Sequence, residues 1–311
     1  MTQRLKTVII GLGVMGKNHF RILRDLPEIE IVGLCDPSPQ GIEDQAVFGS
    51  VEHLLTEKEF DLAIIAVPTP YHREIAATLM KRGATMLIEK PVASTVWQAR
   101  EILETAQQGN IPVAVGHTER FNPVVQTLKQ EVAGKEILSI NIARIGPYPP
   151  RITNVGILTD LAVHDIDLLR FITGKEIVNG SIYKTRKIDG HLEDNATLSF
   201  QLEGKTVANI VTNWLTPFKK RRIEVATEDA YYEADLISQE LTEYSRYTEH
   251  SPYQENSSYV TRHCIVPKGE PLRGELAALI NYAHCGERGH LADIEDSLLT
   301  LEVIDRFGID K

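Results

Sequence analysis

The sequence predicts an α/β protein in two parts: a doubly wound parallel sheet, then a smaller α/β region with an open, mainly antiparallel sheet. Through the first third of the chain, short apolar runs alternate with amphipathic stretches, which is typical of strand–helix–strand units. After about residue 118, longer strand-like runs are joined by turns and are interrupted by few helices. The change of rhythm therefore predicts two domains, over residues 1–118 and 119–292.

The first part is predicted to consist of strands with helices between them. Strands are expected at residues 5–10, 30–35, 61–66, 85–88 and 112–116. Helices are expected at residues 14–25, 71–82 and 94–108. Because crossover helices cover both faces of such a sheet, its strands are expected to be parallel and buried.

The second part is predicted to form an antiparallel sheet with helices on one face. Its strand-like runs are residues 137–145, 177–186, 196–201, 206–214 and 223–227. Its helices are expected near 158–173 and 272–285, and an amphipathic terminal helix near 294–307. The segment 240–258 is polar and has little apolar periodicity, so it is predicted to be an exposed loop or an irregular edge.

Composition excludes several classes of protein. The 311 residues carry a net charge of −10, which disfavours nucleic acid and anionic membranes as partners. The three cysteines, Cys35, Cys264 and Cys285, are too few and too scattered for a disulfide framework or a thiolate zinc site. We find no secretory signal pattern and no apolar run long enough to cross a membrane, so the protein is expected to be cytoplasmic.

A glycine-rich turn follows the first predicted strand. Gly11 would let the chain leave the strand sharply, Gly13 would leave room for a pyrophosphate, and Gly16 would let the next helix pack closely. The first helical residues, Val14 and Met15, would direct backbone N–H groups and the positive helix end at the phosphates. This segment predicts a dinucleotide site.

An acid completes the dinucleotide motif. Asp36 ends the second predicted strand and lies 20 residues after Gly16, where a carboxylate would accept hydrogen bonds from a ribose. A carboxylate there would repel a 2′-phosphate, and no arginine follows directly to bind one. The sequence therefore favours NAD over NADP.

Further cofactor contacts are expected where other parallel strands end, because ligands bind at that edge of the sheet. These residues follow the third and fourth predicted strands: Val67, Pro68, Thr69, His72, Glu89 and Lys90. A lysine at this edge, partly desolvated beside a cationic nicotinamide, could donate to a substrate hydroxyl or exchange a proton with it. The alternative is a solvated surface lysine beside the turn that Pro91 makes.

Asp160 and His164 are spaced to share one face of a predicted helix. A histidine is a natural proton acceptor for an alcohol that loses a hydride. The alternative is a buried histidine satisfied by a carboxylate. The pair His164 and Asp167 could suggest metal ligands, but no second histidine or cysteine stands at ligand spacing nearby, and no metal is expected.

With the glycine motif, Glu89-Lys90-Pro91 and the Asp160/His164 pair in this order, the chain resembles the Gfo/Idh/MocA oxidoreductases. The resemblance implies an N-terminal Rossmann domain that binds NAD, a C-terminal α/β domain, and a polyhydroxylated substrate. It also implies that Lys90 is the active-site lysine and that Asp160 and His164 are its catalytic partners. A homodimer or homotetramer formed through the open sheet is expected, with the terminal helix, residues 293–308, packed on the NAD-binding domain.

Three segments, residues 116–125, 143–151 and 160–167, are similar to the members of this family that oxidise the 3-hydroxyl of UDP-N-acetylglucosamine. The 3-keto product of those enzymes is then aminated by an aminotransferase, which is an expected partner here. The residues implied to bind the nucleotide-sugar are Lys90, Glu119, Arg120, Asn122, Arg144, Tyr148, Arg151, Asp160 and His164.

The role of each of these residues stays open at this point. Arg144, Arg151 and the basic run 219–222 have the chemistry to bind a diphosphate, although that run could equally be a solvated strand start, and Arg120 could instead form an ion pair. His164 would accept the hydroxyl proton and Lys90 would polarise the oxygen, or the two roles could be exchanged. Other substrates are the corresponding uronate, a free sugar or inositol. A non-catalytic sensor of NAD or sugar is a further alternative.

Overall fold

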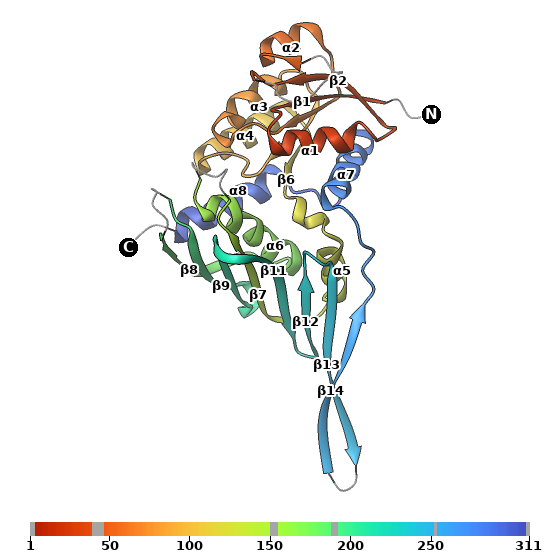
Figure 1. Ribbon diagram of the computed structural model, residues 1–311, viewed down its shortest axis with the longest axis vertical. Coiled ribbons are helices and arrows are strands. Elements are labelled where there is room, and N and C mark those ends of the chain that lie inside the picture. The colour runs from red at the N-terminus through yellow and green to blue at the C-terminus, as the bar shows by residue number, and fades with distance from the viewer. Residues whose placement is uncertain (1–3, 39–46, 150–154, 188–191, 252–253, 309–311) are drawn as a thin grey trace. The chain divides into compact units, whose positions relative to one another are not determined.

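The computed structural model describes residues 4–38, 47–149, 155–187, 192–251 and 254–308, and the chain divides into two compact units (Figure 1). The first unit is Met1–Thr118 with Leu272–Glu302. The second unit is Glu119–Pro271 with Val303–Lys311.

A parallel sheet forms the centre of the first unit, as predicted. Within the described residues its strand order is β3-β2-β1-β4-β5-β6. The strands are β1 (Leu5–Ile10), β2 (Ile29–Cys35), β3 (Val47–Phe48), β4 (Leu62–Ile65), β5 (Thr85–Glu89) and β6 (Val113–Gly116). Apart from β3, which is too short to produce a pattern, these are the strands expected from the apolar runs. Every residue of β4, β5 and β6 is buried, because helices cover the sheet.

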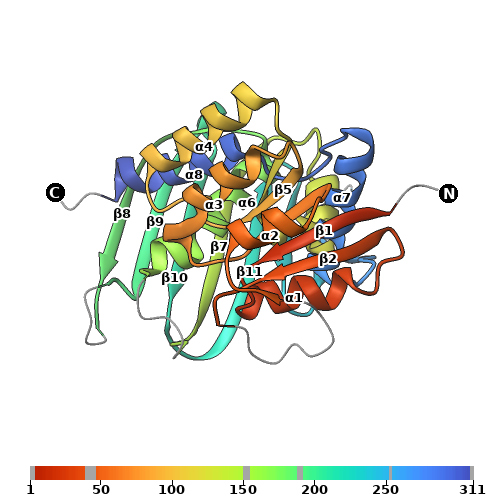
Figure 2. The same cartoon turned by 90° about the horizontal axis from the view of Figure 1, so that it is seen from above.

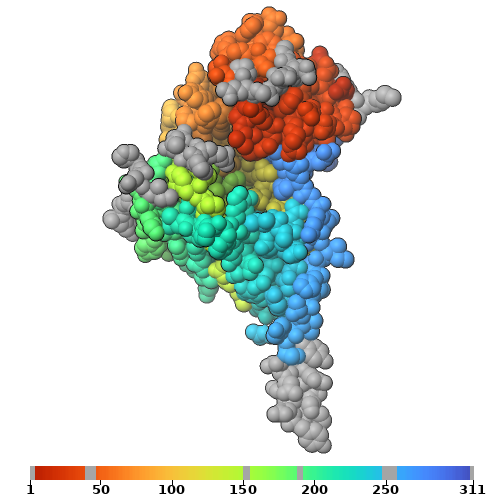
Figure 3. Space-filling view, in the orientation of Figure 1, coloured from red at the N-terminus to blue at the C-terminus, as the bar shows by residue number. Residues whose placement is uncertain are grey.

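Helix α4 of the first unit begins and ends at recognisable capping residues. Thr95 accepts a hydrogen bond from the N–H of Gln98 to begin α4, and Asn110 ends it in the left-handed conformation. The helices are α1 (Val14–Leu23), α2 (Val51–Glu57), a short 3₁₀ turn η1 (Thr69–Tyr71), α3 (His72–Met80) and α4 (Val96–Gly109). Figure 2 shows α3 and α4 side by side, and α1 (red) and α2 (orange) are on the surface in Figure 3.

Two later helices also contribute to the first unit. Helix α7 (Pro271–Cys285) belongs to it from Leu272 onward, and its buried Glu275 accepts a hydrogen bond from Thr118. Helix α8 (Ile294–Phe307) is divided between the units after Glu302, whose carboxylate pairs with Arg100 of α4 at 2.6 Å. These associations are long-range side-chain contacts, which apolar periodicity does not reveal.

The second unit is built on a sheet of order β14-β13-β12-β11-β7-β10-β9-β8, antiparallel except where β7 and β10 run parallel. Its strands are β7 (Ile137–Pro147), β8 (Ile177–Thr185), β9 (Asn195–Leu202), β10 (Val207–Asn213), β11 (Leu215–Thr227), β12 (Ala230–Asp235), β13 (Glu240–Ser251) and β14 (Gln254–Cys264). Alternate residues of β9, β10 and β12 are buried, so one face of the sheet packs on the core.

Helices cover that core face. They are α5 (Pro123–Glu131) and α6 (Val163–Thr173). A π-helical turn (Leu158–Ala162) precedes α6, and a 3₁₀ turn, η2 (Thr118–Phe121), precedes α5. A second 3₁₀ turn, η4 (Glu203–Lys205), joins β9 and β10. Helix α5 was not predicted. Of the two alternatives for residues 240–258, the exposed loop is wrong, because β13 and β14 pair along their length there; the hairpin does lie at the edge of the sheet. Tyrosine and threonine favour strands, and the absence of a simple apolar alternation concealed the hairpin.

No helix among the described residues combines the length and the apolar character needed to cross a bilayer.

Candidate active site

The glycine turn between β1 and α1 has the backbone that its sequence predicts. Gly11 has φ of +90°, and a Cβ there would lie 2.6 Å from the carbonyl oxygen of Ala66. A Cβ at Gly16 would lie 1.8 Å from the carbonyl oxygen of Gly11. By contrast, a Cβ at Gly13 meets no atom within 4 Å, so this side of the turn is open. The first and third glycines are required by packing, and the second leaves space at the helix start, which fits a dinucleotide pyrophosphate.

Asp36 holds the same turn from the end of β2. Its Oδ2 accepts the N–H of Leu12 at 2.7 Å, and its Oδ1 accepts the N–H of Ser38 at 2.8 Å. The carboxylate is half-buried, and each oxygen has a second lone pair that could accept from a ribose. Asp36 therefore orders the glycine turn, a role that spacing did not reveal, and its contact with a ribose stays a prediction.

His72 joins two turns at the edge of the first sheet. Its Nε2 lies 2.9 Å from the carbonyl oxygen of Val67, and its Nδ1 lies 3.0 Å from that of Pro91. Burial lowers the pKa of His72 despite these two acceptors. The ring is buried, so its expected contact with the cofactor stays a prediction. Pro68 is exposed, and Val67 and Thr69 are half-buried.

Glu89 and Lys90 end β5 and lead into a cis peptide bond before Pro91. Lys90 is half-buried, whereas Glu89 is 6% exposed. Glu89 pairs with His19 of α1 over 2.7 Å. Sequence reasoning did not single out His19, and the contact spans 70 positions of the chain. Val14, at the start of the same helix, is exposed, and Met15 is half-buried.

In the second unit, Asp160 and His164 lie where the π-helical turn becomes α6, and both are half-buried. Glu193 orders the start of this turn: its carbonyl oxygen accepts the N–H of Ile157 at 3.0 Å, and its carboxylate accepts that of Leu158 at 3.3 Å. A side chain at Gly156 would collide with Glu193. The wider π turn, which is common at functional sites, was not predicted from the four-residue spacing.

Glu119 and Arg144, which were both expected to bind substrate, contact each other. Its Oε1 accepts from Arg144 at 3.0 Å and from Arg221 at 3.1 Å. Burial alone would raise the pKa of Glu119, but the two guanidinium groups outweigh it and hold that pKa below its usual range. Arg144 also donates to Asp165 at 2.7 Å. Burial raises the pKa of Asp165 to about 6, although Arg144 opposes the rise.

Arg120 and Asn122 have different surroundings from Arg144. Arg120 makes a two-bond pair with Asp167, at 2.8 and 2.5 Å, and both side chains are buried. Asn122 caps α5, because its side-chain oxygen accepts the N–H of Val124 and its amide nitrogen donates to the carbonyl of Leu236 at 3.1 Å. These contacts position η2 and α5. The substrate contacts expected of both residues stay predictions.

Of the last two expected substrate residues, Tyr148 directly follows β7. Tyr148 is 37% exposed and packs edge-on against Trp214, with 5.5 Å between ring centres. Arg151 lies outside the described residues.

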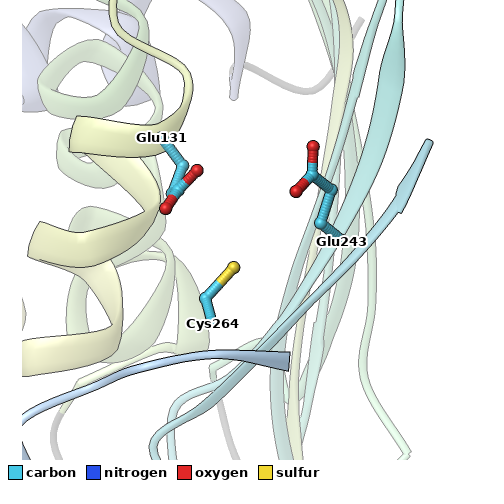
Figure 4. Close-up of side chains that lie close together, drawn as sticks. All are labelled: Glu131, Glu243 and Cys264. Atoms are coloured by element: carbon cyan, nitrogen blue, oxygen red, sulfur yellow. The ribbon is translucent and has the colours of Figure 1, made fainter. Parts of the chain in front are cut away.

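One group of ligand-type atoms occurs among the described residues. Glu131, Glu243 and Cys264 have ligand atoms within 4.8 Å of one another, and Figure 4 shows their side chains pointing toward one another. Arg262 pairs with both carboxylates, with Glu131 at 2.5 Å. The Arg262 guanidinium already donates to both carboxylates, so we describe this group as an ion-pair cluster and assign no metal to it.

Comparison with known proteins identifies related chains. Residues 5–117 match the family model "Oxidoreductase family, NAD-binding Rossmann fold", and residues 96–233 match the model "GFO/IDH/MocA C-terminal domain". The UDP-N-acetylglucosamine 3-dehydrogenase of Acidithiobacillus ferrooxidans is 28% identical over 248 residues, which cover 78% of this chain and 77% of that protein. An inositol 2-dehydrogenase of Saccharopolyspora erythraea is 28% identical over 58% of this chain and 57% of its own length.

Solved structures agree with the fold. The structure of the A. ferrooxidans enzyme superposes with a TM-score of 0.85 at 24% identity, covering 98% of this chain and 96% of that one. An Agrobacterium radiobacter oxidoreductase solved with NAD+, L-tartaric acid and magnesium superposes with a TM-score of 0.80 at 18% identity, covering 97% and 95%. The matches to both domain models, together with the glycine turn and its acid, lead to one conclusion: the chain belongs to the Gfo/Idh/MocA family of oxidoreductases, and residues 5–117 form its NAD-binding Rossmann fold.

Proposed function

We propose that this protein is an NAD-dependent dehydrogenase that oxidises the 3-hydroxyl of UDP-N-acetylglucosamine to the 3-keto nucleotide-sugar. One observation supports this substrate above the others: similarity to an enzyme of that activity extends over 78% of the chain, whereas similarity to the inositol enzyme covers 58%. An aminotransferase that consumes the ketone is the proposed partner.

Lys90, Asp160 and His164 are the proposed catalytic residues. Oxidation breaks the C3–H and O–H bonds and forms a carbonyl, and NAD, when bound, accepts the hydride. The imidazole of His164 takes the hydroxyl proton, because an unassisted alkoxide is costly at neutral pH. The ammonium of Lys90 donates a hydrogen bond to the oxygen as it becomes a carbonyl. Asp160 orients His164 or the hydroxyl.

Arg221 is the proposed diphosphate ligand within the basic run. Its side chain is 41% exposed, whereas that of Arg144 is 5% exposed and pairs with two carboxylates. A guanidinium has five donors in a fork that matches phosphate oxygens, so Arg221 can hold Glu119 and still offer donors to a ligand. Arg144 would then support Glu119 and act on the substrate through it.

The direct test is formation of NADH from NAD and UDP-N-acetylglucosamine, with an aminotransferase added to remove the ketone. Lys90→Met and His164→Asn should each lower turnover by about 100-fold or more while NADH binding persists. Lys81→Met, at an exposed lysine of the same unit, is the matched control. Near-normal turnover in both catalytic variants would remove these assignments.

Substrate comparison separates the alternatives. Free N-acetylglucosamine should be a poor substrate, because it lacks the diphosphate that Arg221 would bind. Equal turnover of the free sugar would reject the nucleotide-sugar proposal, and faster turnover of the uronate or of inositol would reassign it. Absence of NADH formation with every sugar and polyol tested would instead favour a sensor that binds NAD without catalysis.

A homodimer or homotetramer formed through the open sheet face is also proposed. Among the described residues, the positions of β8 and β10 that alternate with the core-facing ones expose the apolar side chains Tyr183, Val207 and Val211. An exposed apolar surface on a sheet is typical of an interface. The mass of the protein in solution, measured by light scattering, tests this, and a monomer at micromolar concentration would contradict it.

A further inference from the structure

The turn that carries Lys90 is attached to a buried, hydrogen-bonded histidine–carboxylate pair. Glu89 directly precedes Lys90, and its Oε1 lies 2.7 Å from Nε2 of His19. The His19 side chain is 0% exposed and the Glu89 side chain 8% exposed. Buried charged groups are rare unless they are paired. The pair joins α1, which begins at the glycine turn, to the end of β5.

The charge state of Glu89 follows from its surroundings. Burial alone would raise the pKa of Glu89, but the hydrogen bond from His19, the charge of His19 and the charge of Lys90 together hold that pKa below its usual range. Glu89 is therefore a carboxylate, which only accepts, so Nε2 of His19 donates. Among the described residues, Nδ1 of His19 has no hydrogen-bond partner. The contact between Nε2 and Glu89 therefore determines the orientation of the His19 ring.

Space for the Glu89 carboxylate is provided by a glycine on the neighbouring strand. Gly116 is the register partner of Glu89, and a Cβ at Gly116 would lie 3.1 Å from Glu89 Oε2. The same oxygen accepts the backbone N–H of Lys90 at 3.3 Å. The carboxylate is therefore held between His19, the neighbouring strand and the backbone of Lys90.

We propose that His19 and Glu89 form a positioning pair that sets the backbone and the charge environment of Lys90 for the reaction. The inference rests on the role proposed above for Lys90. Without the imidazole donor, a buried carboxylate would be left unpaired, and it would take up a proton or rotate away from the backbone of Lys90. Either change would remove the negative charge or the hydrogen bond that accompanies the lysine.

Kinetics of three variants test the proposal with NAD and UDP-N-acetylglucosamine. His19→Leu and Glu89→Gln should lower kcat by about tenfold or more, while KM for NAD changes by less than about threefold. His19→Gln, whose amide can still donate to the carboxylate, should recover kcat to within about threefold of wild type. His53→Gln, at an exposed histidine of α2 in the same unit, is the control.

A second measurement does not need a substrate. The rate at which the Lys90 amine is reductively methylated, relative to exposed lysines, is read by mass spectrometry of the purified protein. The unprotonated amine is the reactive form, so loss of the carboxylate charge in His19→Leu should speed labelling of Lys90 by about threefold or more. His19→Gln should leave the rate near that of wild type.

The outcomes separate this inference from the proposed function. Lys90→Met with full turnover, or no turnover of any sugar, rejects the proposed function, and the labelling rates then decide the positioning pair alone. Unchanged kcat and unchanged labelling in His19→Leu overturn the pair. The proposal is also overturned if kcat falls in His19→Leu, is not recovered in His19→Gln, and labelling of Lys90 is not faster. The contact between His19 and Glu89 would then be purely structural.

Discussion

Replacement of Asp36 by asparagine should weaken NADH binding and reduce the preference for NADH over NADPH. The Asp36 carboxylate accepts two backbone N–H groups, from Leu12 at 2.7 Å and from Ser38 at 2.8 Å. An asparagine side chain has one oxygen and an NH₂ group, so it can accept from one of these donors and must face the other with a donor of its own. The glycine turn therefore loses one charge-assisted hydrogen bond.

The structure sets the size of this effect. A hydrogen bond to a charged group contributes about 1.5–3 kcal/mol, and about 1.4 kcal/mol corresponds to a tenfold change in affinity. The Kd for NADH should therefore rise by about tenfold to about a hundredfold in Asp36→Asn. The Kd for NADPH should rise less, or fall, because the carboxylate that would repel a 2′-phosphate is gone.

Fluorescence titration of NADH and NADPH measures both constants. Asp25→Asn is the matched control, because Asp25 lies just beyond α1 with a side chain that is 62% exposed. Kd values for NADH and NADPH that both stay within about twofold of wild type would refute the reasoning, because they would mean that Asp36 neither orders the turn nor faces the ribose.

Three more predictions follow. Gly16→Ala should abolish detectable NADH binding in a titration, because the added Cβ would lie 1.8 Å from the carbonyl oxygen of Gly11. Asp167→Asn should cost about 3–5 kcal/mol in urea unfolding, because it removes the buried carboxylate partner of Arg120. The pKa of Asp165 rises from 3.8 to about 6 on folding. The protonated form therefore stabilises the folded chain fully below about pH 4, and this stabilisation is lost as the pH rises through about 6. The loss amounts to about 3 kcal/mol. The free energy of unfolding of wild type relative to Asp165→Asn should therefore fall over that interval.

Specific results would contradict these three predictions. NADH affinity in Gly16→Ala near that of wild type would mean that the turn can shift without loss of its site. A cost below about 1 kcal/mol in Asp167→Asn would mean that water reaches the pair. A difference between wild type and Asp165→Asn that does not change with pH would mean that this carboxyl titrates alike in the folded and unfolded chain.

Much of the first unit could be predicted because its signals are local. A run of apolar residues, a glycine turn and a following amphipathic stretch lie within β1 and α1, and the alternation repeats through β6. A parallel sheet follows from that order, because parallel strands need crossover connections. The second unit was predicted less completely. Residues 240–258 have strand-forming residues but no simple apolar alternation, and the hairpin there is recognised only from its pairing.

The candidate site divides in the same way. Lys90, Asp160 and His164 were found from short motifs. Other residues contact partners that are distant in the chain. His19 pairs with Glu89, and Glu193 orders the start of the π turn. Arg221 pairs with Glu119, which is 102 residues away. Pairing across such distances depends on strand register and helix packing, so motif spacing could not reveal it.

The sequence by itself determined the fold class and the glycine turn of the NAD-binding fold with its acid, and it led to the proposal of Lys90, Asp160 and His164 as catalytic residues. Only the tertiary structure decided which charges are already paired. Arg120 and Arg144 have the chemistry to bind phosphate, yet each is buried against carboxylates, whereas Arg221 keeps a large part of its side chain in solvent. The physical reason is that a residue type determines what a group can bind, whereas burial and partners determine how much of that capacity remains for a ligand.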